Sequence, residues 1–444
     1  MALGLMAALC RRGLSVAPFK VGPDFIDPGH HAQVTGTVSR NLDGWMLSRD
    51  YNRACFARHA RKADVAVVEG VMGLFDGFSG RSEEGSTAQM AKWLGLPVLL
   101  VVNAASMARS AAALLQGFER FDADVTFAGA LFNHLGSESH LAYLEAATAE
   151  YVEMPLLGGI LREERLVMPE RHLGLMTAEE LVLSEDDCAR LADCIEDAID
   201  LDALLAVLPE IEAAPEGKVY GCRQRSSAVR IGVARDSAFC FYYADNIDLL
   251  AGAGAEVVPF RPLIDNGLPE RLDGIYLGGG YPELHGRQLA ANGAMRRSIR
   301  ACSRAGMPIY AECGGFMYLC RALEDHEGDV HSMCGVFPFR TRMNARLRRL
   351  GYREVRLGDA TVIGGKDEVV RGHEFHYSDL VSTEPSEKIS TAYTVTGSRG
   401  AMAKAEGYQV QRTLGSYVHL HFGSRPVCAT AFVGACRAYR QQFK

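Results

Sequence analysis

The chain has 444 residues, a formal net charge of −7 and a pI near 6.0, and 48% of its residues are hydrophobic. This length has room for about two or three domains that each bury a core, and we expect two. The negative charge argues against nucleic acid or an anionic membrane surface as the main partner, which leaves a small-molecule substrate as the expectation. The sequence shows neither a long apolar run nor a basic leader before an apolar stretch, so no membrane span or secretory signal is expected. Because the chain has 12 cysteines and no CxxC pair, we expect a reducing compartment, the cytoplasm, rather than disulfides or a thiolate zinc site.

In the first half of the chain, apolar segments of strand length alternate with segments of helical periodicity. This alternation predicts a mostly parallel sheet whose two faces are covered by helices, which is a doubly wound α/β fold. Ligands are expected at the carboxyl ends of such strands. The expected strands are 15–21, 64–69, 97–103, 126–133 and 155–161, and the expected helices are 87–94, 108–118 and 138–151.

The segment 209–228 collects proline, glycine and charged residues without apolar periodicity, which is typical of a linker between domains. The alternation of strands and helices starts again after this segment. We therefore predict two doubly wound α/β domains, 1–208 and 229–440. The expected elements that open the second domain are strands at 229–234, 256–260 and 273–277 and a helix at 242–251.

The most informative motif starts at Pro308 and reads Pro-Ile-Tyr-Ala-Glu-Cys-Gly-Gly-Phe-Met, an apolar strand that ends on Cys313 and turns through two glycines into a helix. A thiol on such a turn projects toward the first amides of the helix, which are expected to lower its pKa and to leave room for an oxyanion hole. A free cysteine is more commonly just buried. The two glycines favour a nucleophile here, because each weakens a helix start by roughly 1 kcal/mol relative to alanine.

A cysteine nucleophile needs a base, and the motif Gly-Ser-Tyr-Val-His-Leu-His-Phe places His419 and His421 on a predicted strand far downstream. Three glycines follow the predicted strand 273–277, and they can turn backbone amides toward a developing anion. Gly279 and Gly280, with Gly314 after the cysteine, are our candidates for the oxyanion hole. A flexible loop explains the glycine run equally well. The cysteine and the distant histidine together indicate acyl-transfer chemistry.

Carboxylates gather at the ends of predicted strands in the first half of the chain. Hard cations such as Mg²⁺ prefer oxygen ligands, and phosphates prefer positive charge. Each acid taken alone is more commonly a turn or cap residue, but the set lies in glycine-rich turns and includes a lysine. These features favour a site for Mg²⁺ and a nucleotide phosphate. The residues are Lys20, Asp24, Asp27, Asp43, Glu69 and Asp76.

Motifs along nearly the whole chain match, in order, those of one known family. In the first half they are Phe-Lys-Val-Gly-Pro-Asp at 19–24, Asp-Pro-Gly-His-His at 27–31, Ser-Arg-Asn-Leu-Asp at 39–43, Val-Glu-Gly-Val-Met-Gly-Leu-Phe-Asp-Gly at 68–77 and Pro-Glu-Arg-His-Leu-Gly at 169–174. In the second half they are Arg-Asp-Ser-Ala-Phe-Cys-Phe-Tyr-Tyr at 235–243, Tyr-Leu-Gly-Gly-Gly-Tyr-Pro-Glu at 276–283, Ala-Glu-Cys-Gly-Gly at 311–315, Gly-Tyr-Arg-Glu at 351–354 and Gly-His-Glu-Phe-His-Tyr at 372–377. By these motifs the chain resembles the cobyrinate a,c-diamide synthase family.

The resemblance implies a P-loop fold like that of dethiobiotin synthetase, joined to a flavodoxin-like class I glutamine amidotransferase domain. It also implies a ligase that consumes ATP and glutamine to amidate the a and c acetate carboxylates of cobyrinate in cobalamin biosynthesis. A carboxylate resists attack by ammonia until one of its oxygens is phosphorylated, so an acyl phosphate intermediate is expected.

For the glutaminase half, the resemblance implies that Cys313 attacks the glutamine amide, that His419 handles its proton, and that the released ammonia travels internally to the synthetase site. His419 is preferred to His421 because related amidotransferases place their histidine two residues after the tyrosine. Their triads usually add a glutamate two residues beyond the histidine, where this chain has His421. The third triad member is therefore absent or replaced, and His421 becomes a candidate substrate contact.

For the synthetase half, the resemblance implies that Asp24, Asp27, Asp43, Glu69 and Asp76 bind Mg²⁺ or activate the substrate. It further implies that Lys20 neutralises phosphate charge and that Asn133 reads the nucleotide base with its amide. The family's Walker A loop, GxxxxGK(S/T), directly precedes the helix matched here from Leu3, and this motif does not occur in the sequence. Either the start codon was assigned late or productive ATP binding has been lost. The retained acids and Lys20 favour the late start.

Five arginines lie between 340 and 349. Such a run is usually a solvated face, but a substrate with several carboxylates can be captured by it, and Arg346 is the candidate contact. Three alternatives to the leading function stay open: a nickel-sirohydrochlorin or hydrogenobyrinate a,c-diamide synthase, a plain glutaminase, and a non-catalytic nucleotide-sensing module. The expected partners are cobyrinate or a related tetrapyrrole, L-glutamine and ATP. We expect neither nucleic acid nor a membrane as a partner, and no transition metal. The macromolecular partner that we consider is a second copy of this chain, which would form a homodimer.

Overall fold

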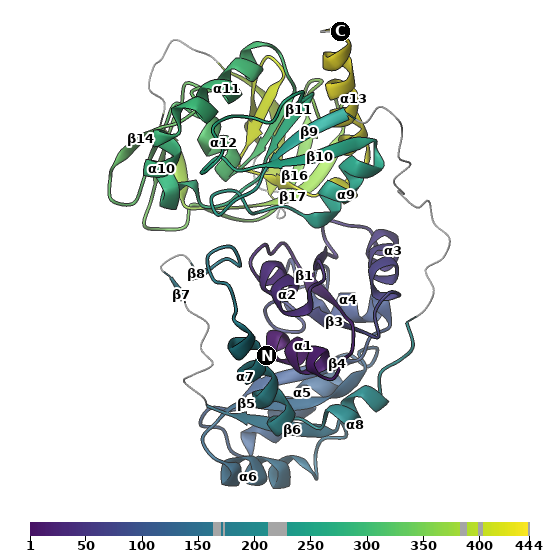
Figure 1. The fold of residues 1–444 in the computed structure, drawn as a ribbon. Coiled ribbons are helices and arrows are strands. Elements are labelled where there is room, and N and C mark those ends of the chain that lie inside the picture. Colours follow the sequence, from purple (N-terminus) through teal and green to yellow (C-terminus); the bar gives the residue numbers. More distant parts are fainter. Residues whose placement is uncertain (163–169, 172–173, 212–228, 382–388, 398–402, 443–444) are drawn as a thin grey trace. The chain divides into compact units, whose positions relative to one another are not determined.

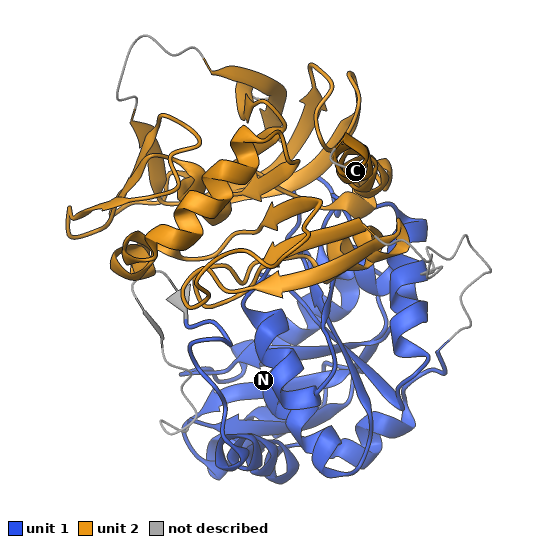
Figure 2. Cartoon of the chain, turned by 45° about the horizontal axis from the view of Figure 1, so that its top comes forward, with its two compact units in different colours: residues 1–217 blue, residues 218–444 orange. Residues whose placement is uncertain are grey.

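The computed structural model describes residues 1–162, 170–171, 174–211, 229–381, 389–397 and 403–442. The chain divides into two compact units, Met1–Gly217 and Lys218–Lys444 (Figure 2). This division falls inside the segment that we predict as a linker. Most of that segment, 212–228, lies outside the described residues, so the linker and the domain boundaries stay predictions.

The first unit contains two parallel three-stranded sheets (Figure 1). We expected one mostly parallel sheet, and this expectation was wrong for the described residues. The strands β3 and β4 share no ladder there: β3 pairs with β1, and β4 pairs with β5. The first sheet has the order β2-β1-β3, with β1 at Val16–Val21, β2 at Arg40–Leu42 and β3 at Val65–Glu69. The second has the order β4-β5-β6, with β4 at Val98–Asn103, β5 at Phe127–Leu135 and β6 at Leu156–Leu161.

Helix α1 (Ala2–Arg11) covers one face of both sheets. Its Leu9 packs with Val16 of β1, and its Ala8 belongs to the cluster that includes Leu99 of β4. The remaining helices of this unit are α2 (Asp27–Thr35), α3 (Arg49–Ala60), α4 (Thr87–Leu94), α5 (Ser110–Phe121), α6 (Glu138–Thr148), α7 (Glu185–Ala198) and α8 (Leu201–Ala206), and the short strands β7 (Glu170–Arg171) and β8 (Gly174–Leu175) form a two-stranded ladder.

Helix α4 covers the opposite face of both sheets. Its Met90 packs with Phe19 of β1, and its Ala88 packs with Leu100 of β4. The residue before Leu100, Leu99, lies in the cluster of α1, so successive residues of β4 point to opposite faces of the sheet. The start of this helix is fixed by Ser86, whose hydroxyl accepts a hydrogen bond from the Gln89 amide. The layered, doubly wound packing that we predicted is therefore present, although the sheet between the layers is split in two.

The second unit is built on five parallel strands in the order β10-β9-β11-β12-β21. In chain order this is 2-1-3-4-5, the flavodoxin-like arrangement that the sequence resemblance implied. One hydrophobic cluster joins this sheet to α9 (Ala244–Gly252) and α13 (Val427–Gln442), and a second joins it to α10 (Gly286–Ala291), α11 (Gly293–Arg304) and α12 (Gly314–Leu319). The five strands are β9 (Val229–Ala234), β10 (Ala255–Phe260), β11 (Gly274–Leu277), β12 (Ile309–Glu312) and β21 (Thr413–Ser416).

The parallel sheet continues into a run of antiparallel strands, of which the sequence predicted the strand that carries His419 and not the others. After β21 the order is β20-β19-β16-β17-β22, and β22 follows β21 in the chain after only two residues. The run therefore curls back toward the parallel strands, which brings β17 close to the end of β12. These strands are β16 (Arg349–Leu357), β17 (Val369–His376), β19 (Ser390–Gly397), β20 (Lys404–Val410) and β22 (His419–Leu420). A separate sheet has the order β14-β13-β15-β18, with β13 at Ala322–Glu324, β14 at Val330–Ser332, β15 at Arg340–Met343 and β18 at Ser378–Val381.

The described helices were also searched for a segment that could cross a bilayer. None of them combines the necessary length with the necessary apolar character.

Candidate active site

Cys313 occupies a strained turn between β12 and α12. Its backbone has φ 43° and ψ −105°, a conformation with positive φ that residues other than glycine rarely adopt. The turn is held from both sides, because the Cys313 amide donates to the carbonyl of Ser416 at 2.7 Å and its carbonyl accepts from the Met317 amide at 2.9 Å. The turn that the sequence predicted at Cys313 is therefore present, and its backbone is strained.

The thiol of Cys313 is not activated at rest, and here our expectation was wrong. Burial raises the pKa of Cys313 well above its ordinary value, and the negative charge of Glu283 adds to this effect. The hydrogen bond from the Gly314 amide acts in the opposite direction but is outweighed. Cys313 is 7% exposed as a residue, and its Sγ lies 4.0 Å from the carbonyl oxygen of Phe375. A base must therefore remove its proton during the reaction.

His419 supplies an imidazole that is neutral at physiological pH. It lies on β22, directly opposite His373 of β17, and the two rings stack with centroids 4.9 Å apart. Burial lowers the pKa of His419 to about 3, and the charge of His376 contributes in the same direction, while Glu374 opposes the shift. A neutral imidazole can accept a proton, which is what a general base requires.

Gly279 makes room for His419, and this changes our assignment for the glycine. A Cβ on Gly279 would lie 2.3 Å from Cε1 of the imidazole, much closer than side chains can approach. The Gly279 amide already donates to the carbonyl of Phe241 at 3.2 Å. We therefore remove Gly279 from the predicted oxyanion hole and assign it to the close approach of this histidine.

The other two predicted oxyanion residues lie against each other. A Cβ on Gly314 would be 3.0 Å from the backbone nitrogen of Gly280, so only a glycine lets these two segments come this close. The Gly314 amide also interacts with the Cys313 thiol. Two backbone amides beside a nucleophile are the arrangement that stabilises an oxyanion, and this role stays a prediction for Gly280 and Gly314.

His421 and Arg346, the two predicted substrate contacts, are placed very differently. His421 is 1% exposed, its Nδ1 accepts from the Gly423 amide at 3.1 Å, and its ring lies 4.5 Å from that of Tyr243. Burial lowers the pKa of His421 to about 4. These contacts give His421 a part in holding the turn after β22. Arg346 is exposed on the segment between β15 and β16, where a soluble anion can reach it, and its predicted role is untested.

Two buried carboxylates near Cys313 were missed by our sequence analysis. Glu312 ends β12 and is 1% exposed, and its Oε2 lies 4.0 Å from Nδ1 of His419. Glu374 of β17 accepts hydrogen bonds from Arg353 at 2.6 Å and from His376 at 2.9 Å. The available signal was a charged residue inside each of two otherwise strand-like motifs, Ala-Glu-Cys and His-Glu-Phe-His.

In the first unit, four of the predicted residues lie close together at the carboxyl ends of β1 and β3. Lys20 is buried, and its Nζ lies 2.6 Å from Asp27 and 3.2 Å from Glu69. Burial alone would lower the pKa of Lys20, but the charges of Glu69 and Asp27 raise it above its ordinary value. His31, which we did not predict as a site residue, holds Glu69 through its Nε2 at 2.9 Å. These residues, called the Lys20 cluster below, therefore hold a protonated lysine in a fixed position among carboxylates.

Asp24 is the carboxylate of this cluster with the most perturbed titration. Burial raises the pKa of Asp24 to about 6, and the negative charge of Asp27 adds to the shift, while Lys20 opposes it. Its Oδ1 accepts from the amides of Ile26 and Asp27. Crowded, partly desolvated carboxylates of this kind are stabilised by a bound cation, so the donor set of Asp24, Asp27 and Glu69 fits the predicted Mg²⁺.

The remaining predicted residues of the first unit make local contacts. Asp43 is 1% exposed and accepts from the amides of Trp45 and Met46, and Asp76 is exposed and accepts from the Gly73 amide at 3.0 Å. These are turn-capping contacts, and neither is with the Lys20 cluster. Asn133, on β5, accepts from the His134 amide at 2.9 Å. Their functional roles stay predictions.

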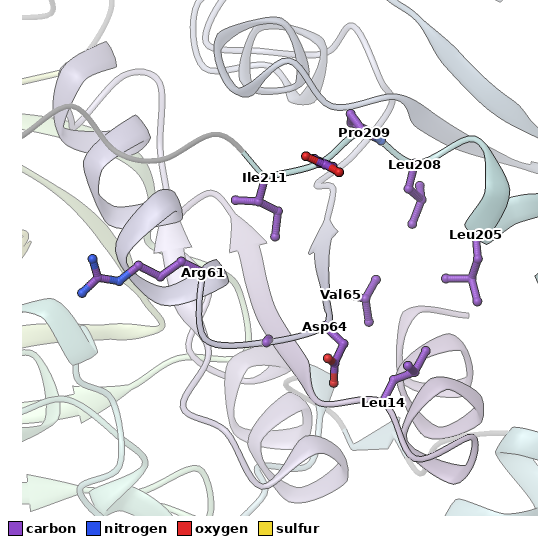
Figure 3. Close-up of a pocket in the computed structure, with 10 residues that line it drawn as sticks. Leu14, Arg61, Asp64, Val65, Leu205, Leu208, Pro209 and Ile211 are labelled. Atoms are coloured by element: carbon purple, nitrogen blue, oxygen red, sulfur yellow. The ribbon is translucent and has the colours of Figure 1, made fainter.

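A pocket in the first unit lies at the amino ends of β1 and β3, and Figure 3 shows apolar side chains around it. The Lys20 cluster lies at the other end of these strands. None of the predicted site residues lines this pocket, and we assign it no part in the reaction. Its lining is Leu14, Arg61, Ala63, Asp64, Val65, Leu205, Leu208, Pro209, Glu210 and Ile211.

Two family models match the chain. The CobQ/CobB/MinD/ParA nucleotide binding domain matches residues 1–175, and the CobB/CobQ-like glutamine amidotransferase domain matches residues 230–427. The fold, the Cys313 elbow and these two matches define the class of protein: a nucleotide-binding domain joined to a glutamine amidotransferase domain.

Similar proteins that carry a functional name extend this match to nearly the full length. Three examples, each named cobyrinate a,c-diamide synthase, show this. The one from Syntrophotalea carbinolica is 45% identical over 98% of this chain and 95% of its own, the one from Salmonella typhimurium is 42% identical over 98% and 94%, and the one from Listeria innocua is 42% identical over 98% and 95%. The chain therefore belongs to the cobyrinate a,c-diamide synthase family, which confirms the resemblance found in its motifs.

Proposed function

We propose that this chain is a glutamine-dependent ligase that uses ATP to amidate the a and c acetate carboxylates of cobyrinate, a step of cobalamin biosynthesis. The observation that carries the proposal is the strained turn at the buried Cys313, in a chain that belongs to this family over nearly its full length.

In the proposed glutaminase reaction, His419 accepts the thiol proton of Cys313 while the sulfur attacks the amide carbon of glutamine. The amides of Gly280 and Gly314 stabilise the resulting oxyanion. The carbon–nitrogen bond then breaks, ammonia leaves with a proton from His419, and a thioester remains. Water hydrolyses the thioester, which releases glutamate and restores the thiol. The high pKa of Cys313 explains why the proton transfer to His419 is needed.

In the proposed synthetase reaction, a carboxylate oxygen of cobyrinate attacks the γ-phosphorus of ATP, and ADP leaves. Ammonia then attacks the carbonyl carbon of the acyl phosphate and gives up one proton. The carbon–oxygen bond to phosphate breaks, phosphate leaves with that proton, and an amide remains. Lys20 is suited to neutralise phosphate charge because it stays protonated among Asp27 and Glu69. Repeating the sequence on the second acetate gives the diamide.

The carboxylates of Asp24, Asp27 and Glu69 would hold Mg²⁺, which supplies charge neutralisation for the phosphates when bound. Asp43 and Asp76 would join this role only if their turn contacts rearrange, so we place them second. Asn133 remains our candidate for the nucleotide base.

The test is ATP hydrolysis and product mass for the 444-residue chain with glutamine and cobyrinate, beside a version extended upstream to any in-frame GxxxxGK(S/T). We expect the extended chain to form the diamide and to hydrolyse ATP only when glutamine and cobyrinate are both present. If both versions hydrolyse glutamine and neither consumes ATP, the protein is a glutaminase and the proposed ligase function is wrong.

A further inference from the structure

Glu312 is a buried carboxylate at the centre of the glutaminase site, and the proposed mechanism does not yet use it. It is the residue directly before Cys313, and it ends β12, whose other residues are apolar or aromatic. The side chain is 1% exposed. Burying a carboxylate at such a position raises the free energy of the folded state. The carboxylate therefore needs hydrogen-bond donors that compensate for this, or a function that requires it there.

Three groups donate hydrogen bonds to this carboxylate. Oε1 accepts from the hydroxyl of Tyr310 at 2.6 Å and from the amide of Leu420 at 3.0 Å, and Oε2 accepts from the hydroxyl of Tyr276 at 2.9 Å. The amide of Leu420 is the one that follows His419. Glu312 thus ties the backbone of the histidine segment to the residue beside the nucleophile.

The same carboxylate faces the side chain of His419. Its Oε2 lies 4.0 Å from Nδ1 of the imidazole, and both side chains are at most 2% exposed. In the resting state this is an electrostatic contact rather than a hydrogen bond. An anion on the Nδ1 side favours the tautomer that carries a proton on Nδ1 and leaves Nε2 to accept the proton of a thiol.

We propose that Glu312 takes the place of the missing triad acid. It is a positioning residue that orients His419 through the Leu420 amide and stabilises the positive charge of the imidazole when it takes the proton of Cys313. The usual position of the acid, two residues after the histidine, holds His421, so here the acid comes from the strand that ends at the nucleophile. This inference rests on the glutaminase step of the proposed function.

The other charged groups around His419 do not fill this role. Glu374 on β17 is engaged by Arg353 and His376 on its two oxygens. His376 also places its Nδ1 2.8 Å from the carbonyl of Ser378, so both of its ring nitrogens have partners. His373, which stacks on His419, places its Nδ1 2.7 Å from the hydroxyl of Tyr243.

The titration of Glu312 is compatible with this role. Burial raises the pKa of Glu312 to about 7, against the lowering effect of its three donors. The titratable groups that face this pair come from several elements. They are Tyr242 just before α9, Tyr276 on β11, Tyr310 and Cys313 on and after β12, His373, Glu374 and His376 on β17, and Tyr393 on β19. The carboxylate therefore ionises within the pH range in which the enzyme can be assayed.

The test is the reactivity of Cys313 toward iodoacetamide between pH 6 and pH 9 in the wild type and in Glu312→Gln, read by mass spectrometry of the peptide that contains this cysteine. We expect alkylation at pH 7 to be at least tenfold slower in the variant, with a difference that grows from pH 6 toward pH 9 as Glu312 of the wild type becomes fully ionised. Glutamine hydrolysis should lose about 10- to 100-fold in kcat while KM changes less than twofold. Glu312→Asp should recover part of the loss because it keeps the charge. Glu324→Gln, at the end of β13, is the matched control and should behave as the wild type.

Equal alkylation rates and equal kcat in the wild type and a folded Glu312→Gln protein would overturn the inference. If this variant does not fold, Tyr276→Phe provides the test. It removes the donor to the oxygen that faces His419, which raises the pKa of Glu312 and leaves less of the carboxylate ionised, so alkylation at pH 7 should be at least threefold slower. No change in that rate would overturn the inference as well. Because alkylation reads Cys313 directly and needs neither ATP nor cobyrinate, failure of this inference can be told apart from failure of the proposed ligase function.

Discussion

Replacing Gly279 by alanine tests how closely this glycine approaches the imidazole of His419. The added Cβ would lie 2.3 Å from Cε1 of the imidazole and 3.3 Å from each of its nitrogens. Carbon atoms prefer about 3.5–4.0 Å, so the ring must move by roughly 1.2 Å or more. The backbone of Gly279 does not have a positive φ, so alanine adds the clash without a conformational penalty.

The expected effect follows from this displacement. A shift of about 1 Å in a catalytic group typically costs about 100-fold in rate, so kcat for glutamine hydrolysis should fall by about two orders of magnitude. Overpacking a tight site typically costs about 1–3 kcal/mol of unfolding free energy, which corresponds to a fall of roughly 2–12 °C in Tm.

Glutamate release under saturating glutamine measures kcat, and thermal unfolding measures the folded fraction. Gly274→Ala is the matched control, because its Cβ would also lie 2.3 Å from a neighbour, the sulfur of Cys436, at the other end of β11. This control should lose stability but keep its turnover per folded molecule. A folded Gly279→Ala protein with wild-type kcat would refute the reasoning.

Three further predictions concern single residues. Cys313→Ser should lower glutamine-dependent amidation by roughly 1,000-fold or more while amidation with added ammonium salt continues, since only the glutaminase step uses the thiol; loss of both activities would contradict separate roles for the two units. Lys20→Met leaves Asp27 and Glu69 without their cation, so the free energy of unfolding should fall by about 2 kcal/mol. ATP-dependent turnover should fall at least tenfold, while glutaminase activity per folded molecule is kept. Unchanged ATP turnover would count against the Lys20 assignment. Burial alone would raise the pKa of Glu374, but hydrogen bonds and charges from His376 and Arg353 lower it to about 2, below the ordinary value of 4.5. Its stabilising contribution is therefore present above pH 4.5 and is lost as the pH falls toward 2, so the difference in unfolding free energy between wild type and Glu374→Gln should shrink by about 2 kcal/mol from pH 5 to pH 3; a difference independent of pH would show that the pair does not hold the carboxylate ionised.

Local patterns in the sequence were sufficient to predict the turn at the nucleophile. Two glycines after Cys313 indicate a close approach of the backbone, and the structure has a tight turn with a positive φ at Cys313. The ionisation of the thiol could not be predicted in this way. It depends on burial and on Glu283, which lies on a different segment, and neither is visible in the local motif.

The carboxylates Glu312 and Glu374 were missed for a similar reason. Their position relative to His419 is set by the curl of the antiparallel strands and by the pairing of His373 with His419, which places β17 beside β22. No periodicity within a single strand encodes that register. The amide of Gly279 was misassigned because its partner, Phe241, precedes it by 38 residues.

The pairing of the strands in the first unit could not be predicted from the sequence either. Alternating apolar segments correctly indicated parallel strands and helices on two faces, since α1 and α4 pack on opposite sides of β1. Which strands pair is decided between neighbours in space, and β3 and β4 do not pair in the described part of the chain.

The central claim is that nitrogen from glutamine reaches cobyrinate through Cys313 chemistry. Its most direct test is incubation of the enzyme, extended upstream where the gene allows, with cobyrinate, MgATP and glutamine labelled with nitrogen-15 in the side-chain amide. The account predicts a product that carries two labelled amides and no product with Cys313→Ser. Hydrolysis of the labelled glutamine without any label in cobyrinate would contradict it.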